Sequence, residues 1–237
     1  MSFYGVKKGR ETGVFENWND TKASIDNFIG AKFKKFKTKE EAYDFINDVK
    51  VIKSDLCKNI PTDCIKVFTD GSCIKVNLDK PHPITKKKYR SLAGYSVYFG
   101  PGSDLNYANY LLKDQTNQLA ELLAIKEAFE ITKKMKEPIV IFTDSMYSIN
   151  CVTRWFGGWE KNGFMTSTGK PVKHLETIKR IRKLYIRSKG RIQFVHINSH
   201  QPKPNCNEND TEYIIWFGNH EADRFASLAA KKSNEII

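Results

Sequence analysis

The sequence predicts an α/β fold with a mixed sheet and flanking helices, preceded by a small α+β unit. Three observations support this prediction: apolar strand patterns at residues 65–70 and 139–142, an amphipathic helix between them, and a separate set of short elements in residues 1–49. A strand, helix, strand order implies a right-handed crossover between parallel strands. Ligands of such sheets collect beyond the carboxyl ends of the strands.

The first 49 residues form a separate predicted unit. The stretch FYGVKKGRETGVFENWND predicts two short strands around a basic turn, and helices are predicted to begin at Thr21 and Thr38. Between the helices, AKFKKFKT interleaves aromatic residues with lysines. This composition suits stacking and phosphate contacts, and it equally suits an edge strand protected by gatekeeper lysines. Residues 50–62 are the predicted linker, which at ~13 residues spans roughly 20 Å as a coil.

A strand is predicted where IKVFTDGSC occupies residues 65–73. Its residues alternate with a period of two, which indicates one face on a core, and the pattern breaks at Gly71. Asp70 is unusual there because Asp is depleted in strands and costly to bury without a partner. It is either a solvated turn residue, since Asp-Gly is a common turn dipeptide, or a charge held at the rim of the sheet for chemistry.

A helix and a second strand follow. Residues 117–136 place apolar side chains at the three-and-four spacing of one helical stripe, and Asn117 is a plausible N-cap. Residues 139–142 are a continuous apolar run, typical of a strand buried on both faces. Asp144 follows this strand, so we expect it at the carboxyl edge of the sheet.

Two further acids belong to the predicted helices. Glu121 shares the inward side of its helix, although a Glu in a first turn is also favoured by the helix dipole by about 0.3–1 kcal/mol. Asp223, in GNHEADRFASLAAKK, is predicted to open the last helix. Clustered carboxylates repel and call for a counter-charge. Hard divalent ions suit such oxygen ligands, and two ions about 3.5–4 Å apart are suited to phosphodiester cleavage.

These motifs carry a family resemblance. FTDGS, QTNQLAELLAI, FTDSMYSIN, INSH and GNHEADRFA occur in the order of the Asp-Glu-Asp-Asp motifs of type 1 ribonucleases H, and the eukaryotic form is the most similar. The resemblance covers roughly residues 63–231. It implies an endonuclease that hydrolyses the RNA strand of RNA–DNA hybrids with two Mg²⁺ ions, or Mn²⁺ in their place, leaving 5′-phosphate and 3′-hydroxyl ends. The implied metal ligands are Asp70, Glu121, Asp144 and Asp223.

The resemblance also implies a catalytic histidine. His200 in FVHINSH matches the mobile family histidine that assists turnover and product release. A single His near a strand end is more often structural, and His196 and His174 compete for the role. The register after the strand favours His200.

Substrate contacts are implied in the same domain. RWFGGWEKNGFMTSTGKPVKH mixes aromatic and basic residues, as do segments that track a nucleic-acid backbone, although an amphipathic surface turn has the same composition. By resemblance this segment is the basic protrusion. Asn117 and Gln118 match residues that reach into the minor groove, and Thr116 matches part of a pocket for a DNA phosphate. The residues implied to face the DNA strand in the protrusion are Trp155, Trp159, Thr166 and Ser167.

The sequence departs from the family pattern at four places. Asp114 stands where relatives carry an arginine in the phosphate pocket, and His174 stands where they carry an asparagine. Residues 77–90 lengthen the first hairpin with three consecutive lysines. Residues 201–217 lengthen the loop after His200, and their Pro and Asn content indicates a loop whose apolar end folds back to anchor it.

The N-terminal unit resembles the hybrid-binding domain found ahead of eukaryotic ribonucleases H. This resemblance implies that aromatic residues contact DNA deoxyriboses, while backbone amides near Lys34 meet RNA 2′-hydroxyls, by which RNA is told from DNA. Double-stranded RNA is a second ligand to be expected of such a domain. The implied binding surface consists of Tyr4, Trp18, Phe33, Lys34, Lys35 and Phe36.

Composition agrees with a two-domain nucleic-acid protein, with a linker at 50–62 and a catalytic domain at 63–237. The net charge of +12 and the pI near 9.4 suit a polyphosphate ligand. No apolar run approaches ~20 residues, so no membrane partner is expected. The five cysteines form no Cys-x-x-Cys pair, which indicates a reducing intracellular compartment, cytoplasm or nucleus. A monomer is expected.

Two alternatives remain open from the sequence. Another two-metal nuclease or a transposase can use the same fold, because fold does not fix chemistry. A catalytically silent hybrid-binding protein would be expected to lack at least one of the four acids, and none is lost here.

Overall fold

The computed structural model describes residues 2–47, 60–61, 63–81 and 86–235. The chain divides into two compact units, residues 1–51 with 149–172 and residues 52–148 with 173–237. The predicted linker lies outside the described residues except at Ile60 and Pro61. Within the described ranges, no helix combines the length and the apolar character needed to cross a bilayer.

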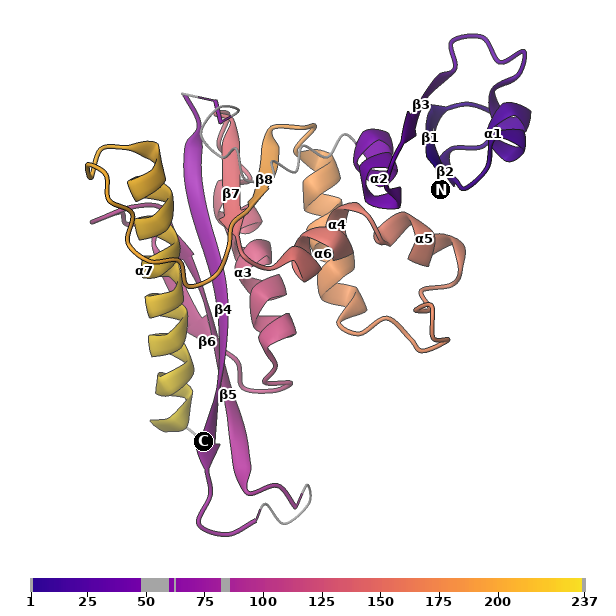
Figure 1. The fold of residues 1–237 in the computed structure, drawn as a ribbon. Coiled ribbons are helices and arrows are strands. Elements are labelled where there is room, and N and C mark those ends of the chain that lie inside the picture. The colour runs from indigo at the N-terminus through magenta and orange to yellow at the C-terminus, as the bar shows by residue number, and fades with distance from the viewer. Residues whose placement is uncertain (1, 48–59, 62, 82–85, 236–237) are drawn as a thin grey trace. The chain divides into compact units, whose positions relative to one another are not determined.

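The N-terminal residues form a three-stranded antiparallel sheet with two helices. The strands are β1 (Phe3–Lys8), β2 (Gly13–Phe15) and β3 (Lys32–Phe36), in the order β2-β1-β3. The helices are α1 (Trp18–Ile25) and α2 (Lys39–Asn47) (Figure 1). The predicted order of strands and helices is confirmed, and β3 is an edge strand, as one of the two interpretations of its lysines required.

Side-chain caps set where these helices begin. The Asn17 side chain accepts a hydrogen bond from a first-turn N–H at 2.9 Å, so α1 begins at Trp18 rather than at the predicted Thr21. At α2, the Thr38 hydroxyl accepts from the Glu41 N–H, and the Glu41 carboxylate accepts from the Thr38 N–H, each at 3.2 Å. This reciprocal pair is a capping box, which explains why the second predicted start was nearly right.

The same unit contains residues 149–172. They include the end of α4 (Met146–Thr153) and the short helix α5 (Phe156–Lys161). The segment after α5 returns on itself, because the Val172 N–H donates to the Phe164 carbonyl at 2.9 Å. The Phe156 and Phe164 rings meet edge to face with centroids 5.7 Å apart.

The second unit contains a five-stranded mixed sheet in the order β6-β5-β4-β7-β8. Its strands are β4 (Ile65–Asn77), β5 (Tyr89–Tyr98), β6 (Tyr107–Tyr110), β7 (Ile139–Thr143) and β8 (Ile192–His196). β4 pairs with β7, and β7 with β8, in parallel, while the remaining pairs are antiparallel. The predicted mixed sheet is therefore confirmed. So is the predicted parallel pair, since β4 and β7 are neighbours in the sheet and a helix lies between them in the chain.

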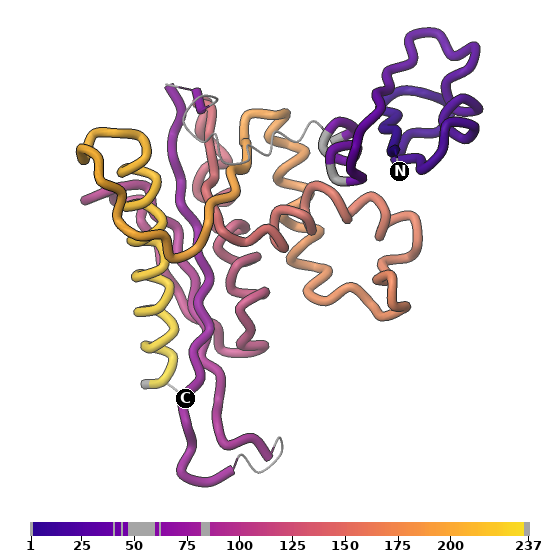
Figure 2. The backbone as a smooth tube through the Cα atoms, viewed as in Figure 1, coloured from indigo at the N-terminus to yellow at the C-terminus, as the bar shows by residue number. Residues whose placement is uncertain are grey.

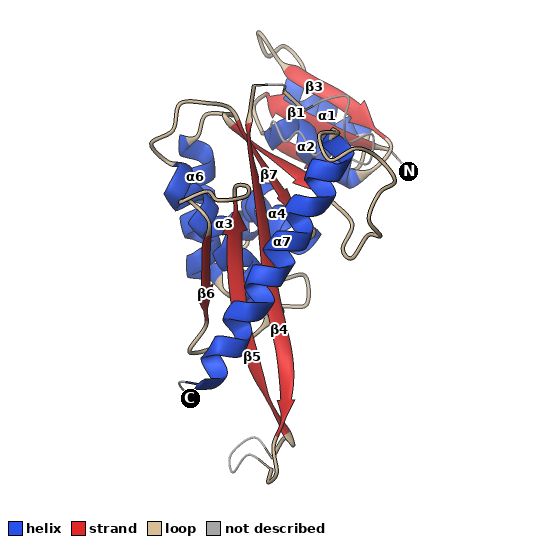
Figure 3. Cartoon of the chain, turned by 90° about the vertical axis from the view of Figure 1, so that its left-hand side faces the viewer, coloured by secondary structure: helices blue, strands red, loops and turns tan. Residues whose placement is uncertain are grey.

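Helices cover both faces of this sheet. They are α3 (Asn117–Thr132), α6 (Leu175–Arg187) and α7 (Thr211–Lys232), which is followed by the 3₁₀ turn η1 (Ser233–Glu235). One buried cluster joins the sheet to α7, and another joins it to α3. Figure 3 shows α7 lying across β4 and β5, and Figure 2 follows the chain from β8 through a loop into α7.

Three sequence predictions for the second unit need correction. β4 does not break at Gly71 but continues to Asn77, and residues 67–71 are buried on both faces rather than on one. α3 ends at Thr132, four residues before the predicted end. α7 begins at Thr211, so Asp223 lies in the middle of the last helix and does not open it.

Candidate active site

Three acids from three elements of the second unit converge. Asp70 lies within β4, Glu121 lies in the first turns of α3, and Asp144 follows β7. One carboxylate oxygen from each lies within 4.8 Å of the others. Asp70 and Glu121 are buried, whereas Asp144 is half-buried. The juxtaposition expected from the sequence is therefore present.

Gly71 makes this convergence possible. A Cβ atom built at Gly71 would lie 2.3 Å from the backbone nitrogen of Glu121 and 2.6 Å from the carbonyl carbon of Ala120. Only a residue without a side chain lets α3 approach β4 so closely. The Asp-Gly pair therefore lies within a strand, where the glycine allows close packing against α3. It is not the turn that one interpretation of the sequence suggested.

The electrostatics of the two buried acids favour a bound cation. Burial raises the pKa of Asp70 well above its usual range, and the charges of Asp144 and Asp223 raise it further. Burial likewise raises the pKa of Glu121, with the charges of Asp70 and Asp144 adding to the rise. The N–H of Gly71 donates to both carboxylates and opposes these shifts only in part. The charged state of this cluster therefore calls for a compensating positive charge.

Asp223 contributes from the other side of the sheet. It is absent from the closest trio, but its side chain takes part in a hydrogen bond with Asp70 that adds to the rise of the Asp70 pKa. It also lines the cavity of about 440 Å³ that contains the other three acids. The structure thus brings all four predicted acids to one cavity.

The donor set fits a divalent metal ion. Glu121 Oε2 is buried and has no hydrogen-bond partner among the described residues, while Glu121 Oε1 accepts a hydrogen bond from Asn117 Nδ2 at 3.4 Å. A buried carboxylate oxygen without a donor is costly unless a cation occupies the space in front of it. All the acids supply oxygen ligands, which Mg²⁺ and similar hard ions prefer.

Several residues that line the acid cavity were missed by the sequence analysis. Ser72 follows Asp70 by two positions, and its hydroxyl lies 3.0 Å from that of Ser227 on α7. Asn219 and Ser227 lie four positions before and after Asp223, and therefore on its side of the helix. Helical spacing from Asp223 would have found Ser227 within the predicted helix, and it would have found Asn219 had the start of α7 been placed correctly.

The three candidate histidines lie in different environments. His200 is exposed and lines the acid cavity. His196 ends β8, and its Nε2 lies 3.1 Å from the carbonyl oxygen of Asp144. His174 precedes α6, where burial lowers its pKa, the charge of Lys173 lowers it further, and Asp114 opposes the shift. His200 is thus the one of the three that borders the acid cavity, while His196 supports the strand end that carries Asp144.

The predicted phosphate-pocket and groove residues lie at the start of α3. Thr116 is the N-cap, since its hydroxyl accepts from the Leu119 N–H at 3.3 Å, and Asn117 is the first helical residue rather than the cap. Asn117 and Gln118 are exposed, and Asn117 also lines the acid cavity. Thr and Asn are both favoured at N-caps, with Asn ranked somewhat higher, which is why the sequence pointed to Asn117.

The protrusion residues belong to the other unit. Trp155 is 39% exposed, and its ring centroid lies 5.7 Å from that of Trp159. Thr166 is half-buried and shares a hydroxyl contact of 3.0 Å with Thr168, while Ser167 is exposed. The paired indoles and the exposed turn are compatible with a nucleic-acid surface and do not form a core.

The N-terminal unit presents an aromatic row. Trp18 and Phe33 are 45% and 43% exposed, and their ring centroids lie 6.0 Å apart, with Tyr4 at 5.5 Å from Trp18. Lys34 and Lys35 are exposed on β3. Phe36 differs from the others because it is half-buried and packs on Phe45 at 5.4 Å, so its ring belongs in part to the core of this unit.

Comparisons with known proteins agree with this architecture. The RNase H family model matches residues 62–231, and the model of the Ribonuclease H1 N-terminal domain matches residues 2–46. Ribonuclease H1 of Homo sapiens is 31% identical over 285 residues, covering 98% of this chain and 91% of its own length. Ribonuclease H of Schizosaccharomyces pombe is 26% identical and covers 98% of both chains.

A solved RNase H domain is also similar to this chain. The PFV RNase H domain in solution is 25% identical, with a TM-score of 0.50, and the match covers 70% of this chain and 93% of that domain. The family model spans most of the chain, and it includes all four acids of the cavity. The chain therefore belongs to the RNase H family and carries, at its N-terminus, a domain of the Ribonuclease H1 N-terminal type.

Proposed function

We propose that this protein is an endonuclease that hydrolyses the RNA strand of RNA–DNA hybrids, leaving 5′-phosphate and 3′-hydroxyl ends. The observation that carries the proposal is the convergence of Asp70, Glu121 and Asp144 in an open cavity of an RNase H family chain, with a buried Glu121 oxygen that has no described donor. Such a cluster is costly for folding and is explained by a role in binding cations at the reaction site.

Asp70, Glu121, Asp144 and Asp223 would hold two divalent ions, Mg²⁺ with Mn²⁺ as a substitute. When bound, such ions supply a Lewis acid and lower the pKa of water, so that hydroxide becomes available at neutral pH. The carboxylates supply the negative charge that selects the ions. Asn117 orients Glu121 through its amide, so that the second carboxylate oxygen points away from protein donors.

His200 has a separate task in this proposal. Its imidazole is exposed at the rim of the acid cavity. A group in this position can pass a proton to the leaving oxygen or help the cleaved strand to depart. His196 supports the Asp144 backbone instead.

Recognition of the hybrid is assigned to two surfaces. The exposed rings of Trp18 and Phe33 and the lysines of β3 would bind the duplex through the N-terminal domain, residues 1–49, within a chain of net charge +12. In the catalytic domain, residues 63–237, Trp155 and Trp159 would face the DNA strand. Contact with 2′-hydroxyls would limit cleavage to RNA.

The test is cleavage of four matched duplexes in Mg²⁺: RNA–DNA, RNA–RNA, DNA–DNA and a hybrid with one embedded ribonucleotide. We expect cuts in the RNA strand of the RNA–DNA duplex, with 5′-phosphate ends, and no cuts in DNA–DNA. Omission of the divalent ion should abolish cleavage. Cleavage of the DNA–DNA duplex at a comparable rate would assign the site to a different nuclease class.

A further inference from the structure

The turn that carries His200 needs to be held in place. His200 has a φ of 50°, in the left-handed region that side chains other than glycine rarely adopt. The predicted insertion at 201–217 is only partly a loop, since α7 takes up residues from Thr211 onward. A loop of about ten residues therefore separates His200 from the helix, which is long enough to move unless side chains fix it.

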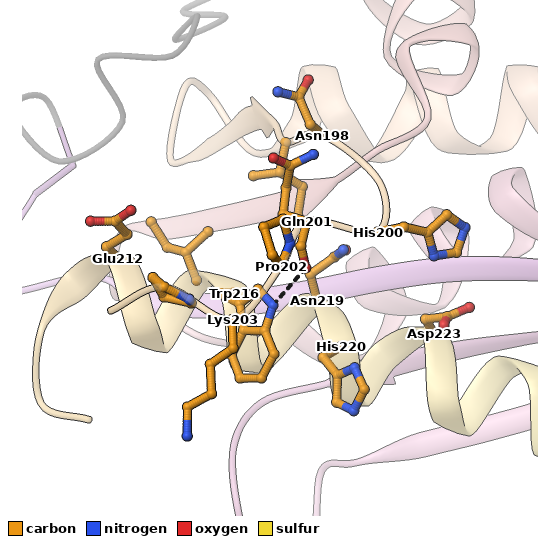
Figure 4. A pocket seen from close by; sticks show the side chains of 13 residues that line it. Asn198, His200, Gln201, Pro202, Lys203, Glu212, Trp216, Asn219, His220 and Asp223 are labelled. Atoms are coloured by element: carbon orange, nitrogen blue, oxygen red, sulfur yellow. Dashed lines mark hydrogen bonds between the residues drawn. The ribbon is translucent and has the colours of Figure 1, made fainter. Parts of the chain in front are cut away.

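Two hydrogen bonds centred on Gln201 fix this turn. The Gln201 side-chain amide donates to the carbonyl oxygen of Ser199 at 3.1 Å, which closes the turn around His200. The indole N–H of Trp216 donates to the carbonyl oxygen of Gln201 at 2.9 Å. Figure 4 shows this second bond, with His200 and Asp223 on the same side of the view.

Trp216 is itself held by α7. Its ring stacks on His220 with centroids 5.4 Å apart and an angle of 11° between the planes. His220 lies three residues before Asp223, on the adjoining turn of the helix. A single indole thus connects the backbone beside His200 to the part of α7 that carries the fourth acid.

Open space borders this connection, although the Trp216 ring also packs beside Tyr213 at 5.6 Å. A second cavity of about 410 Å³ lies between the loop and α7, beside the acid cavity, and it shares His200, Asn219 and Asp223 with that cavity. Trp216 lines this second cavity and is not among the described residues that line the acid cavity. Without the indole bond, the loop has space in which to shift.

We propose that Trp216 is a positioning residue that sets where His200 stands relative to the acid cavity. The proposal rests on the proposed function of His200 in hybrid cleavage. Trp216 touches no reacting group, so its effect on turnover should pass through His200. A merely structural Trp216 would instead stabilise α7, and its loss would act whether or not His200 is present.

The variants follow from the contacts. Trp216→Phe and Trp216→Tyr keep a ring over His220 and remove the indole N–H. The matched control is Tyr213→Phe in the first turn of α7, which removes a hydroxyl that donates to the loop residue Glu208 at 3.2 Å and keeps the ring beside Trp216. Thermal unfolding of each variant measures the effect on folding.

A double-mutant cycle with His200→Ala tests the coupling. We expect Trp216→Phe to lower the multiple-turnover rate on a hybrid by about three- to tenfold, the range that the loss of one hydrogen bond allows. In the His200→Ala background the same change should lower the rate by less than about twofold. Equal losses in both backgrounds, or wild-type turnover in both Trp216 variants, would overturn the proposal.

A second measurement does not depend on cleavage. Backbone ¹⁵N relaxation in the full chain should show increased motion at His200 and Gln201 in Trp216→Phe and Trp216→Tyr, and wild-type motion in Tyr213→Phe. Unchanged motion at both residues would show that the hydrogen bond from Trp216 to Gln201 does not act as a tether for the turn. If the wild-type chain cleaves no hybrid but the relaxation result holds, the proposed function fails while the tether stands.

Discussion

At the scale of single residues, the site brings together buried acids whose raised pKa values show that their charged form is disfavoured unless a positive charge compensates it. The charges that act on Asp70 come from Asp144 and Asp223, and both raise its pKa. The charges of Asp70 and Asp144 likewise raise the pKa of Glu121. Asp144 is half-buried, so its replacement disturbs the packing less than a change at Asp70 or Glu121 would. It is therefore a suitable position at which to separate charge from shape.

The first prediction concerns Asp144→Asn. The amide keeps the shape of the side chain and removes a charge from the proposed metal ligands, so cleavage should fall by about a hundredfold or more, since a bound Lewis acid contributes several kcal/mol. Hybrid affinity in the absence of cleavage should stay within about twofold, because the duplex is held by other surfaces. The exposed Asp104→Asn is the matched control, and it should cleave at the wild-type rate. Near-normal turnover in Asp144→Asn would show that Asp144 is not a metal ligand.

The second prediction separates His200 from His196. His200→Ala should slow multiple turnover and leave measurable single-turnover cleavage, because in the proposed function the imidazole assists turnover and does not hold metal. His196→Ala loses a contact to the Asp144 carbonyl and should act mainly on stability, by about 0.5–1.5 kcal/mol. Both are measured by single- and multiple-turnover kinetics and by thermal unfolding. Wild-type turnover in His200→Ala with a strong loss in His196→Ala would exchange the two roles.

At the scale of elements, local pattern predicted the strands and most helices, and it failed where tertiary contacts decide. The apolar run before Asp144 is a strand because both of its faces are buried, as expected. The Asp70-Gly71 pair was ambiguous because the close approach of α3, which requires the glycine, comes from a segment fifty residues away. No local signal carries that information.

The start of α7 was missed for a related reason. Pro and Asn around residues 202–210 predict a loop, but the apolar residues Ile215, Trp216 and Phe217 pack as the first turns of the helix. This error displaced Asn219 from the predicted site, although the acid Asp223 itself was found. The acids could be predicted because their motifs are local, whereas their neighbours depend on the helix register.

The third prediction tests the approach of α3 to β4. Gly71→Ala places a Cβ 2.3 Å from a backbone nitrogen of α3, and since backbone atoms do not yield readily, unfolding free energy should fall by about 1–3 kcal/mol or more. Cleavage should fall as well, because Glu121 is displaced. Gly157→Ala is the control, since a Cβ there meets nothing within 4 Å. A Gly71→Ala protein with wild-type unfolding and activity would contradict the packing role.

The fourth prediction tests the aromatic row of the N-terminal unit. Exposed stacking residues cost about 1–3 kcal/mol of binding each on truncation, whereas core aromatics cost about 3–5 kcal/mol of stability. Because Trp18 and Phe33 are more than 40% exposed, Trp18→Ala and Phe33→Ala should weaken binding to long hybrids and leave the unfolding midpoint nearly unchanged. Phe36→Ala should instead lower the midpoint, since its ring packs on Phe45.

The same variants have a second readout in cleavage. A short hybrid that only the catalytic domain can cover should be cut by Trp18→Ala at the wild-type rate. Adding Lys34→Ala should flatten the salt dependence of long-hybrid binding, because one phosphate contact is lost. If residues 1–49 can be deleted with no loss of affinity for long hybrids, this unit serves another partner.

At the scale of the whole molecule, the acid cluster links stability to pH and to divalent ions. The folded-state pKa values of Asp70 and Glu121 are raised, so the folded state binds more protons than the unfolded state between the ordinary carboxyl range, about pH 4, and those raised values. Stability from these groups is therefore fully present below about pH 4 and decreases as pH rises. A bound cation reverses this loss, because it binds the charged carboxylates of the folded state alone.

The last prediction follows from this linkage. Without divalent ions, the unfolding midpoint of the wild type should fall more between pH 5 and pH 8 than that of Asp70→Asn, which has lost one of the two shifted groups. Mg²⁺ should raise the wild-type midpoint more at pH 8 than at pH 5, since protons and the cation compete for the same oxygens, and it should raise the Asp70→Asn midpoint less at both pH values. Thermal unfolding with EDTA and with Mg²⁺ measures all four conditions for each protein. Two outcomes would contradict this linkage: an equal rise of the wild-type unfolding midpoint with Mg²⁺ at both pH values, or an equal change of the midpoint with pH in the two proteins. Either would show that the clustered acids do not lower the stability of the folded state.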